Sequence, residues 1–226
     1  GTVTGITLKS IADGTEKKVM VPPNANIGGV SFSPDAKRIS FTNTKANGIE
    51  LWVADAVTGH SRLVSGLDRL NATGSNPVDW LKDGVTMVVQ LVPAGRGPAP
   101  TEPLVPSGPN IQENHGKAAP TPTFEDMIKT NHDEDLFVYY FTSQLVAINS
   151  STGHKTLIGR PGIFENVAPS PNGEYLLVSR IKRPFSRLLP MNGFPKDVEI
   201  WTRRGEIAKK IADLQSAEGV PINGVE

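Results

Sequence analysis

Short apolar or alternating segments, separated by turn residues, recur along this chain and are typical of antiparallel β-structure. The clearest unit covers residues 27–65. Its third expected strand contains Trp52, and Ser33-Pro34-Asp35 and Thr58-Gly59 supply the residue types that tight turns need. Its four expected strands are residues 29–32, 38–42, 49–55 and 61–64. The pattern predicts a four-stranded antiparallel unit.

The same pattern returns twice, and half of it precedes the first unit. The second unit has expected strands at 77–80, 85–91, 143–148 and 155–158, and the third at 165–169, 174–181, 197–201 and 206–211. Two strands, 6–11 and 17–20, resemble the second half of a unit, and residues 220–226 could begin another. Tandem four-stranded units are typical of β-propeller blades, although a β-sandwich also has many short strands. Aligned turns and the recurrence of Trp52 as Trp201 favour the propeller.

We therefore expect an all-β chain that forms a partial β-propeller of about three and a half four-stranded blades. Propellers usually close with about four to eight blades. We therefore expect this chain to be a fragment of a longer protein. The alternative is that two chains together complete one propeller.

An insertion at about residues 92–135 separates the second and third strands of the middle unit. Eight of the 19 prolines lie between Pro93 and Pro122, which excludes regular sheet. A short helix is expected at residues 123–129, with Thr123 as N-cap and Asp126 completing a capping box. The apolar run 136–141 is expected to begin the return to the sheet. Such a long loop could be a lid or docking arm, or a strap packed on the propeller.

Composition excludes several classes of protein. The 226 residues include 23 basic and 23 acidic side chains, which argues against nucleic-acid binding. The absence of cysteine excludes disulfides, thiolate zinc sites and a cysteine nucleophile. It fits an exported or periplasmic bacterial protein and is compatible with a cytoplasmic one. No apolar run reaches the roughly 18 residues that indicate a membrane-spanning helix.

The sequence offers no catalytic motif. A G-x-S-x-G nucleophile elbow is absent. His60 and His154 both follow Thr-Gly in expected hairpins, so we interpret them as exposed turn residues. His132 precedes the acidic run 133–135, but without the spacing of a rigid ligand set. We predict no catalytic residue, no metal site and no cofactor in this chain.

One basic segment is a candidate binding site. Arg180, Arg183 and Arg187 fall within eight residues, together with Lys182. Arginine binds carboxylates through two parallel hydrogen bonds, so these side chains could bind an acidic substrate or partner. The alternative is a solvated strand end.

Several longer strings carry a family resemblance. They are residues 103–112, 123–129, 133–145, 183–186 and 194–201, in order and correctly spaced. Together they resemble the N-terminal propeller of glutamyl endopeptidases, within the prolyl oligopeptidase family of serine peptidases. The resemblance covers about residues 27–221.

The resemblance implies that residues 1–226 are a fragment of an N-terminal propeller that lies over a C-terminal α/β-hydrolase domain. That domain, which carries the Ser, Asp and His, is absent from this chain, so no triad residue is assigned. The implied role is to gate access and to position peptide substrates, with cleavage after acidic residues. The alternative is a non-catalytic propeller module that binds a protein or glycan. Open blade edges could also allow self-association.

Overall fold

The computed structural model describes residues 1–102 and 127–219. Blade 1 is a four-stranded antiparallel sheet in the order β3-β4-β5-β6. Its strands are β3 (Ile27–Phe32), β4 (Arg38–Lys45), β5 (Gly48–Asp55) and β6 (Ser61–Leu63). This blade confirms the first unit expected from the sequence.

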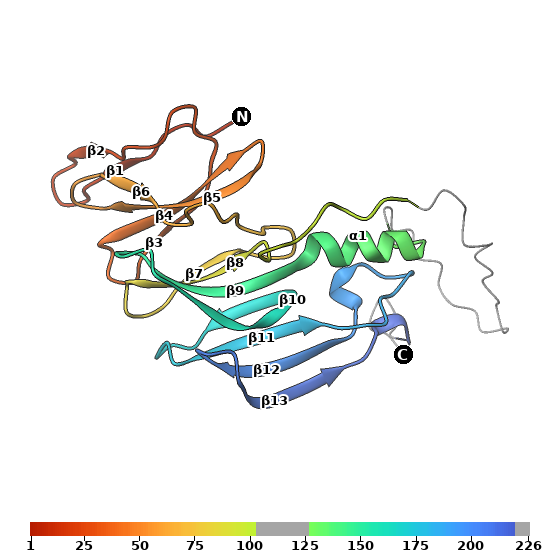
Figure 1. Ribbon diagram of the computed structural model, residues 1–226. Helices are drawn as coiled ribbons and strands as arrows, with labels where there is room; N and C mark the ends of the chain where they lie inside the picture. The colour runs from red at the N-terminus through yellow and green to blue at the C-terminus, as the bar shows by residue number, and fades with distance from the viewer. Residues whose placement is uncertain (103–126, 220–226) are drawn as a thin grey trace, which may run out of the picture.

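Blades 2 and 3 share one seven-stranded sheet, which lies below blade 1 in Figure 1. Its strands are β7 (Val78–Trp80), β8 (Thr86–Leu91), β9 (Thr142–Asn149), β10 (Lys155–Pro169), β11 (Tyr175–Ile181), β12 (Lys196–Thr202) and β13 (Ile207–Leu214). β10 pairs with β9 up to Ile163, as the last strand of blade 2, and with β11 from Ile163 onward, as the first strand of blade 3. Its register along β9 is irregular between Ile158 and Gly162. The expected strands 155–158 and 165–169 are its two arms.

A hairpin of β1 (Thr7–Lys9) and β2 (Glu16–Lys18) precedes blade 1. Ile6 and Leu8 pack there against a buried cluster that contains Phe41 of β4. Three four-stranded blades and this hairpin confirm the partial β-propeller. The expected strand at 220–226 lies outside the described residues.

A repeated side-chain contact explains the recurring tryptophan. Trp52 donates its indole hydrogen to Glu50 at 3.0 Å in blade 1, and Trp201 donates to Glu199 at 2.8 Å in blade 3. Glu199 is 3% exposed, and a buried carboxylate needs such a donor. The Glu-x-Trp pair therefore allows a charged group inside the third strand of a blade.

The core lies between the blades, because the two faces of a strand bury alternate side chains. In β8, Met87 and Val89 pack against Leu51 and Val53 of blade 1. Val88, between them, belongs to a second cluster shared with blade 3. Two β-bridges from Leu70, to Ile49 and Leu91, join blade 1 to blade 2.

The helix in the insertion differs from the expected one. Thr123 and Asp126 lie outside the described residues, and residues 127–129 are not helical. Helix α1 instead covers Asn131–Phe141, after Thr130 as N-cap. The expectation that 136–141 begins the sheet was wrong: β9 starts at Thr142. The reason is a capping box between Thr130 and Asp133, which satisfies amide groups at the helix start.

Two 3-10 helices complete the elements, η1 (Met191–Gly193) and η2 (Ala217–Gly219). Within the described residues, no helix has the length and apolar character that crossing a membrane requires.

Candidate functional site

The long connections of this fold meet at one end of the blades. Strand direction alternates, so loops between second and third strands emerge at the same end as the crossings from one blade to the next. We call this end the long-loop face. It comprises the β4–β5 turn, the crossing 64–77, the described parts of the insertion (92–102 and 127–141) and the loop 182–195. Figure 1 shows α1 and the loop that carries η1 together at this end.

Helix α1 is attached to the loop 182–195 by an aromatic cluster. The ring of Phe137 lies 4.4 Å from that of Phe141, 4.9 Å from that of Phe185 and 5.5 Å from that of Phe194. Phe185 and Phe194 are buried. The end of the insertion is thus packed on blade 3, as expected of a strap, rather than extended into solvent.

Two of the three predicted site residues meet beside this helix. Arg183 forms an ion pair with Glu134, and Arg187 lies 3.7 Å from the same carboxylate. Arg187 also donates to Asn131 at 2.9 Å, and the Arg183 guanidinium lies 4.8 Å from the Phe185 ring centroid. The Arg183 side chain is 53% exposed. Both arginines therefore already face a carboxylate of the chain.

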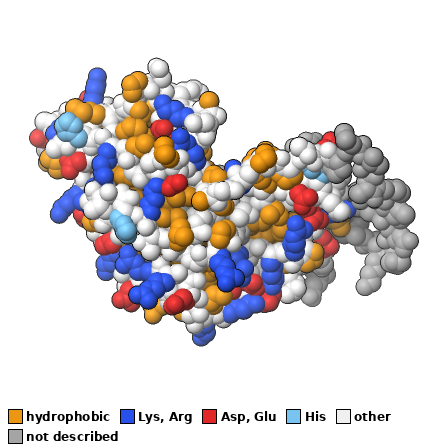
Figure 2. Space-filling view, viewed as in Figure 1, with side chains coloured by type: hydrophobic (Ala, Val, Ile, Leu, Met, Phe, Trp, Pro, Cys, Tyr) orange, Lys and Arg blue, Asp and Glu red, His pale blue; other side chains and the backbone are white. Residues whose placement is uncertain are grey.

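The third predicted residue, Arg180, belongs to a separate network on β11, β12 and β13. It lies 3.5 Å from Asp197 and 3.6 Å from Glu199. Asp197 and Asp213 also bind Lys182, which directly follows β11, and Lys210 of β13. The hydrogen bonds that Lys182 donates to Asp213 and then to Asp197 raise the pKa of Lys182. In Figure 2, basic and acidic side chains accordingly lie interspersed over this part of the surface.

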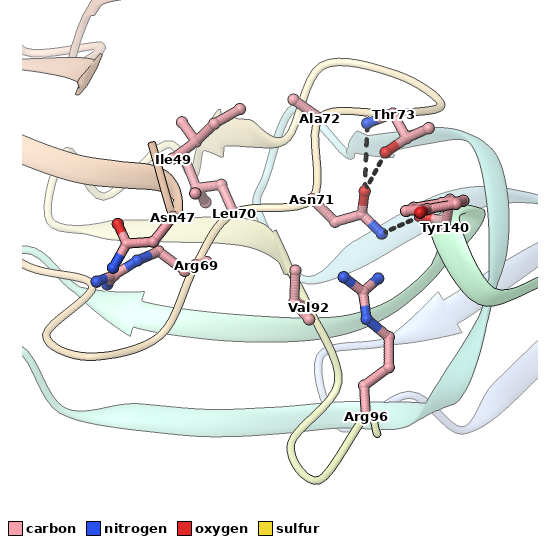
Figure 3. A pocket seen from close by; sticks show the side chains of 11 residues that line it. Asn47, Ile49, Arg69, Leu70, Asn71, Ala72, Thr73, Val92, Arg96 and Tyr140 are labelled. Atoms are coloured by element: carbon pink, nitrogen blue, oxygen red, sulfur yellow. Dashed lines mark hydrogen bonds between the residues drawn. The ribbon is translucent and has the colours of Figure 1, made fainter. Parts of the chain in front are cut away.

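Sequence reasoning missed a hollow between blades 1 and 2 on the same face. It has a volume of about 400 Å³ and lies where three segments of the long-loop face meet the end of α1. Figure 3 shows its side chains, among them two arginines. The lining residues are Asn47, Gly48, Ile49, Arg69, Leu70, Asn71, Ala72, Thr73, Val92, Arg96 and Tyr140. No local motif marks Arg69 or Arg96, because they come from different connections.

Asn71 fixes one wall of this hollow. Its amide donates to the backbone oxygens of Tyr140 and Thr142, at 2.9 and 3.0 Å. Its side-chain oxygen accepts from the Thr73 hydroxyl at 2.6 Å. The crossing between blades 1 and 2 is thereby attached to the junction of α1 and β9.

The described histidines do not form a site. His60 and His154 are exposed in hairpins, as expected. His132 is in the first turn of α1, and residues 1–102 and 127–219 contain no group of three or more side chains placed to hold a metal ion. His115 is not among the described residues.

Sequence comparison identifies the relatives of this chain. No family model matches it. A probable chloroplastic glutamyl endopeptidase of Oryza sativa subsp. japonica is 39% identical over 234 residues, covering 97% of this chain and 24% of the relative. A protein of the same name from Arabidopsis thaliana is 38% identical, covering 94% and 23%. The chain is homologous to glutamyl endopeptidases. It spans about a quarter of the length of these relatives.

Solved structures share the fold of this chain. An acylaminoacyl peptidase of Pyrococcus horikoshii matches 93% of this chain with a TM-score of 0.53 and 16% identity, over 28% of its own length. A prolyl endopeptidase matches 92% with a TM-score of 0.52 and 15% identity, over 26% of its length. At such identities the likeness concerns the fold alone.

Proposed function

We propose that this chain is the propeller portion of a serine endopeptidase, which gates access to a hydrolase domain elsewhere in the protein and positions peptide substrates for it. The observation that carries the proposal is the 39% identity with a glutamyl endopeptidase over nearly the whole chain. The proposal includes cleavage after acidic residues, in line with the name of the relatives.

The distribution of loops supports a gating role. Binding residues are often carried by loops that a rigid scaffold positions. Here α1 is fixed to blade 3 through Phe137 and to the crossing 64–77 through Asn71. The proposal places the hydrolase domain against this long-loop face, where fixed loops would restrict the entry of folded proteins.

The first test is the gene itself and its product. We expect a G-x-S-x-G motif encoded downstream of residue 226. The whole gene product should cleave a short Glu-containing peptide and leave a folded protein with exposed glutamates intact. A stop codon soon after residue 226, or no hydrolysis of any peptide, would favour a non-catalytic module that binds a protein or glycan. The exported or periplasmic location stays a prediction that cell fractionation can test.

Arg183 gives a residue-level test of this proposal. Arg183 is a half-exposed cation beside Glu134. In this proposal it attracts the acidic side chains of the substrate. Arg183→Ala in the whole gene product should raise KM severalfold for a Glu peptide, with little effect on the Gln-matched peptide. Glu134→Gln should have the opposite effect, because it removes the carboxylate that competes for Arg183 and Arg187. Steady-state kinetics that are unchanged in both variants would reject this role.

A further inference from the structure

We infer that the hollow between blades 1 and 2 is a binding site for an extended peptide segment with acidic side chains, whose carboxylates bind Arg69 and Arg96. The inference rests on the proposed function and extends it to residues outside the predicted arginine cluster. Three observations support it: the contacts that position the two guanidinium groups, the carboxylates that they do not contact, and the apolar side chains that lie between them.

The Arg96 side chain is held in place by helix α1. Its Nη1 donates to the backbone oxygen of Tyr139 at 3.0 Å, and its guanidinium lies 4.4 Å from the Tyr139 ring centroid. The Tyr139 hydroxyl donates to the oxygen of Gly97 at 2.8 Å, which fixes the backbone next to Arg96. Figure 3 shows the guanidinium directed toward Asn71 and Tyr140.

Arg69 is held by backbone on the other side of the hollow. Its Nη1 donates to the backbone oxygens of residues 66, 67 and 68, at 3.4, 3.0 and 3.2 Å. Its stem packs on Gly48, where an added Cβ would lie 2.7 Å from the Arg69 Cγ and Cδ. Gly48 also has a φ of +137°, which other residues rarely adopt. The β4–β5 turn therefore leaves room for this side chain.

In the part of the chain that the structure describes, neither cation forms an ion pair. Among the described residues, no Asp or Glu oxygen lies within ion-pair distance of Arg69 or Arg96, and no acidic residue lines the hollow. Glu50 is near enough for Arg69 to contribute to lowering its pKa, but its carboxylate binds Trp52 and Asn43. By contrast, Arg180, Arg183 and Arg187 all face carboxylates.

The groups between the two cations suit the aliphatic part of a peptide. Ile49, Leu70 and Val92 line the hollow, and the half-exposed Tyr140 ring borders it. In Figure 3, Leu70 and Val92 lie between the two arginines. Since a guanidinium binds a carboxylate through charge-assisted hydrogen bonds, an acidic peptide could contact a cation at each end and cover apolar side chains between them.

The test compares matched peptides binding to the 226-residue chain. The probe is an acetylated and amidated alanine-rich peptide with two glutamates, and its partner carries two glutamines. Calorimetric titration should show Glu-peptide binding at least about tenfold tighter than Gln-peptide binding, as expected for charge-assisted hydrogen bonds. Free glutarate, which lacks the peptide backbone, should bind more weakly than the Glu peptide. If glutarate bound equally well, the ligand of the hollow would be a small dicarboxylate, and the inference would be overturned.

Variants identify the residues responsible. Arg96→Gln and Arg69→Gln should each weaken Glu-peptide binding about tenfold, the expected effect of losing one such contact. Arg96→Lys keeps the charge without the planar fork and should lie between wild type and Arg96→Gln. Arg160→Gln removes an exposed cation outside the hollow and should bind like wild type. Equal unfolding midpoints of Arg96→Lys and wild type exclude misfolding as the cause of weaker binding.

The site would also be overturned if the Glu peptide did not bind, if both peptides bound equally, or if Arg160→Gln weakened binding as much as the substitutions in the hollow. The results also distinguish a failure of this binding site from a failure of the proposed peptidase function. If the gene product cleaves Glu peptides while Arg69→Gln and Arg96→Gln bind them normally, the site is wrong and the function stands. If binding needs both arginines but no peptide is cleaved, the peptidase function fails and the site stands.

Discussion

Whether a cation of this chain can meet a ligand depends on the carboxylates that lie opposite it. Arg180 is in a network on blade 3, and Arg183 lies beside Glu134 of α1. Arg69 and Arg96, which no sequence pattern marks, donate hydrogen bonds to backbone oxygens. At the scale of the residue, the local density of charge does not show which arginines face a carboxylate. That depends on the acidic residues that other segments bring opposite them.

The network on blade 3 makes stability depend on pH in a defined window. Hydrogen bonds from Lys182 and then from Lys210 lower the pKa of Asp213 from 3.8 to about 2. A lowered folded-state pKa stabilises the fold above the unfolded-state value, and this contribution is lost as the pH falls through the folded-state value. We expect the free energy of unfolding to fall between about pH 5 and pH 2, and to fall less in Asp213→Asn.

Chemical denaturation of both proteins across this window, at constant ionic strength, measures the difference. The effect should be modest and should shrink at high salt, because Asp213 is exposed and water and ions screen its interactions. Parallel pH profiles for wild type and Asp213→Asn would show that the ion pairs do not contribute.

The formation of helix α1 depends on its N-terminal cap and on contacts with residues distant in the sequence. The run 136–141 is rich in aromatic residues, which favour strands. It is helical because the helix starts at a capping box, and because Phe137 and Phe141, four residues apart, share the face that meets Phe185. The partner aromatic residues come from the loop 182–195, so a local reading could not include them.

The cap of α1 can be tested directly. The Thr130 hydroxyl accepts from the Asp133 amide at 3.1 Å, and the Asp133 carboxylate accepts from the Thr130 amide at 2.8 Å. Thr130→Ala should destabilise the protein by about 1 kcal/mol, the usual cost of losing such a cap. Thr130→Ser keeps the hydroxyl and should retain most of the stability. Equal free energies of unfolding for the two variants would contradict a capping role.

At the scale of the whole molecule, the outer face of blade 3 differs from the faces between blades. Leu176 and Val178 of β11 are buried against blade 2. Leu177, which points to the opposite face, is 42% exposed, as is Tyr175. In β8 of blade 2, by contrast, Val88 and its neighbours Met87 and Val89 are buried on both faces. An apolar blade face and open edges are surfaces through which the chain could self-associate.

Self-association therefore remains a prediction, and a second exposed leucine of the chain provides a matched control variant. Light scattering should show a molecular mass that rises with concentration, and Leu177→Asp should reduce the rise because it places a charge on the apolar face. Leu67→Asp makes the same change at a loop leucine that is 94% exposed, and should behave like wild type. A concentration-independent monomer would contradict self-association, and equal effects of both variants would exclude the face of blade 3.

The sequence by itself determined the strands and their grouping into blades. Strand period and turn chemistry act over a few residues: Asp55 and Asn149, at equivalent positions, each accept backbone hydrogen bonds within their own turns. The long matching strings also sufficed to find the family. These features are local, and so they could be read in order along the chain.

Only the tertiary structure decided the placement of α1, the pairing of Arg183 and Arg187 with Glu134, and the hollow that holds Arg69 and Arg96. Each depends on segments that are brought together when the blades pack side by side. A side chain's charge is visible in sequence, but the group opposite it is set by the packing of distant connections, which no local pattern encodes.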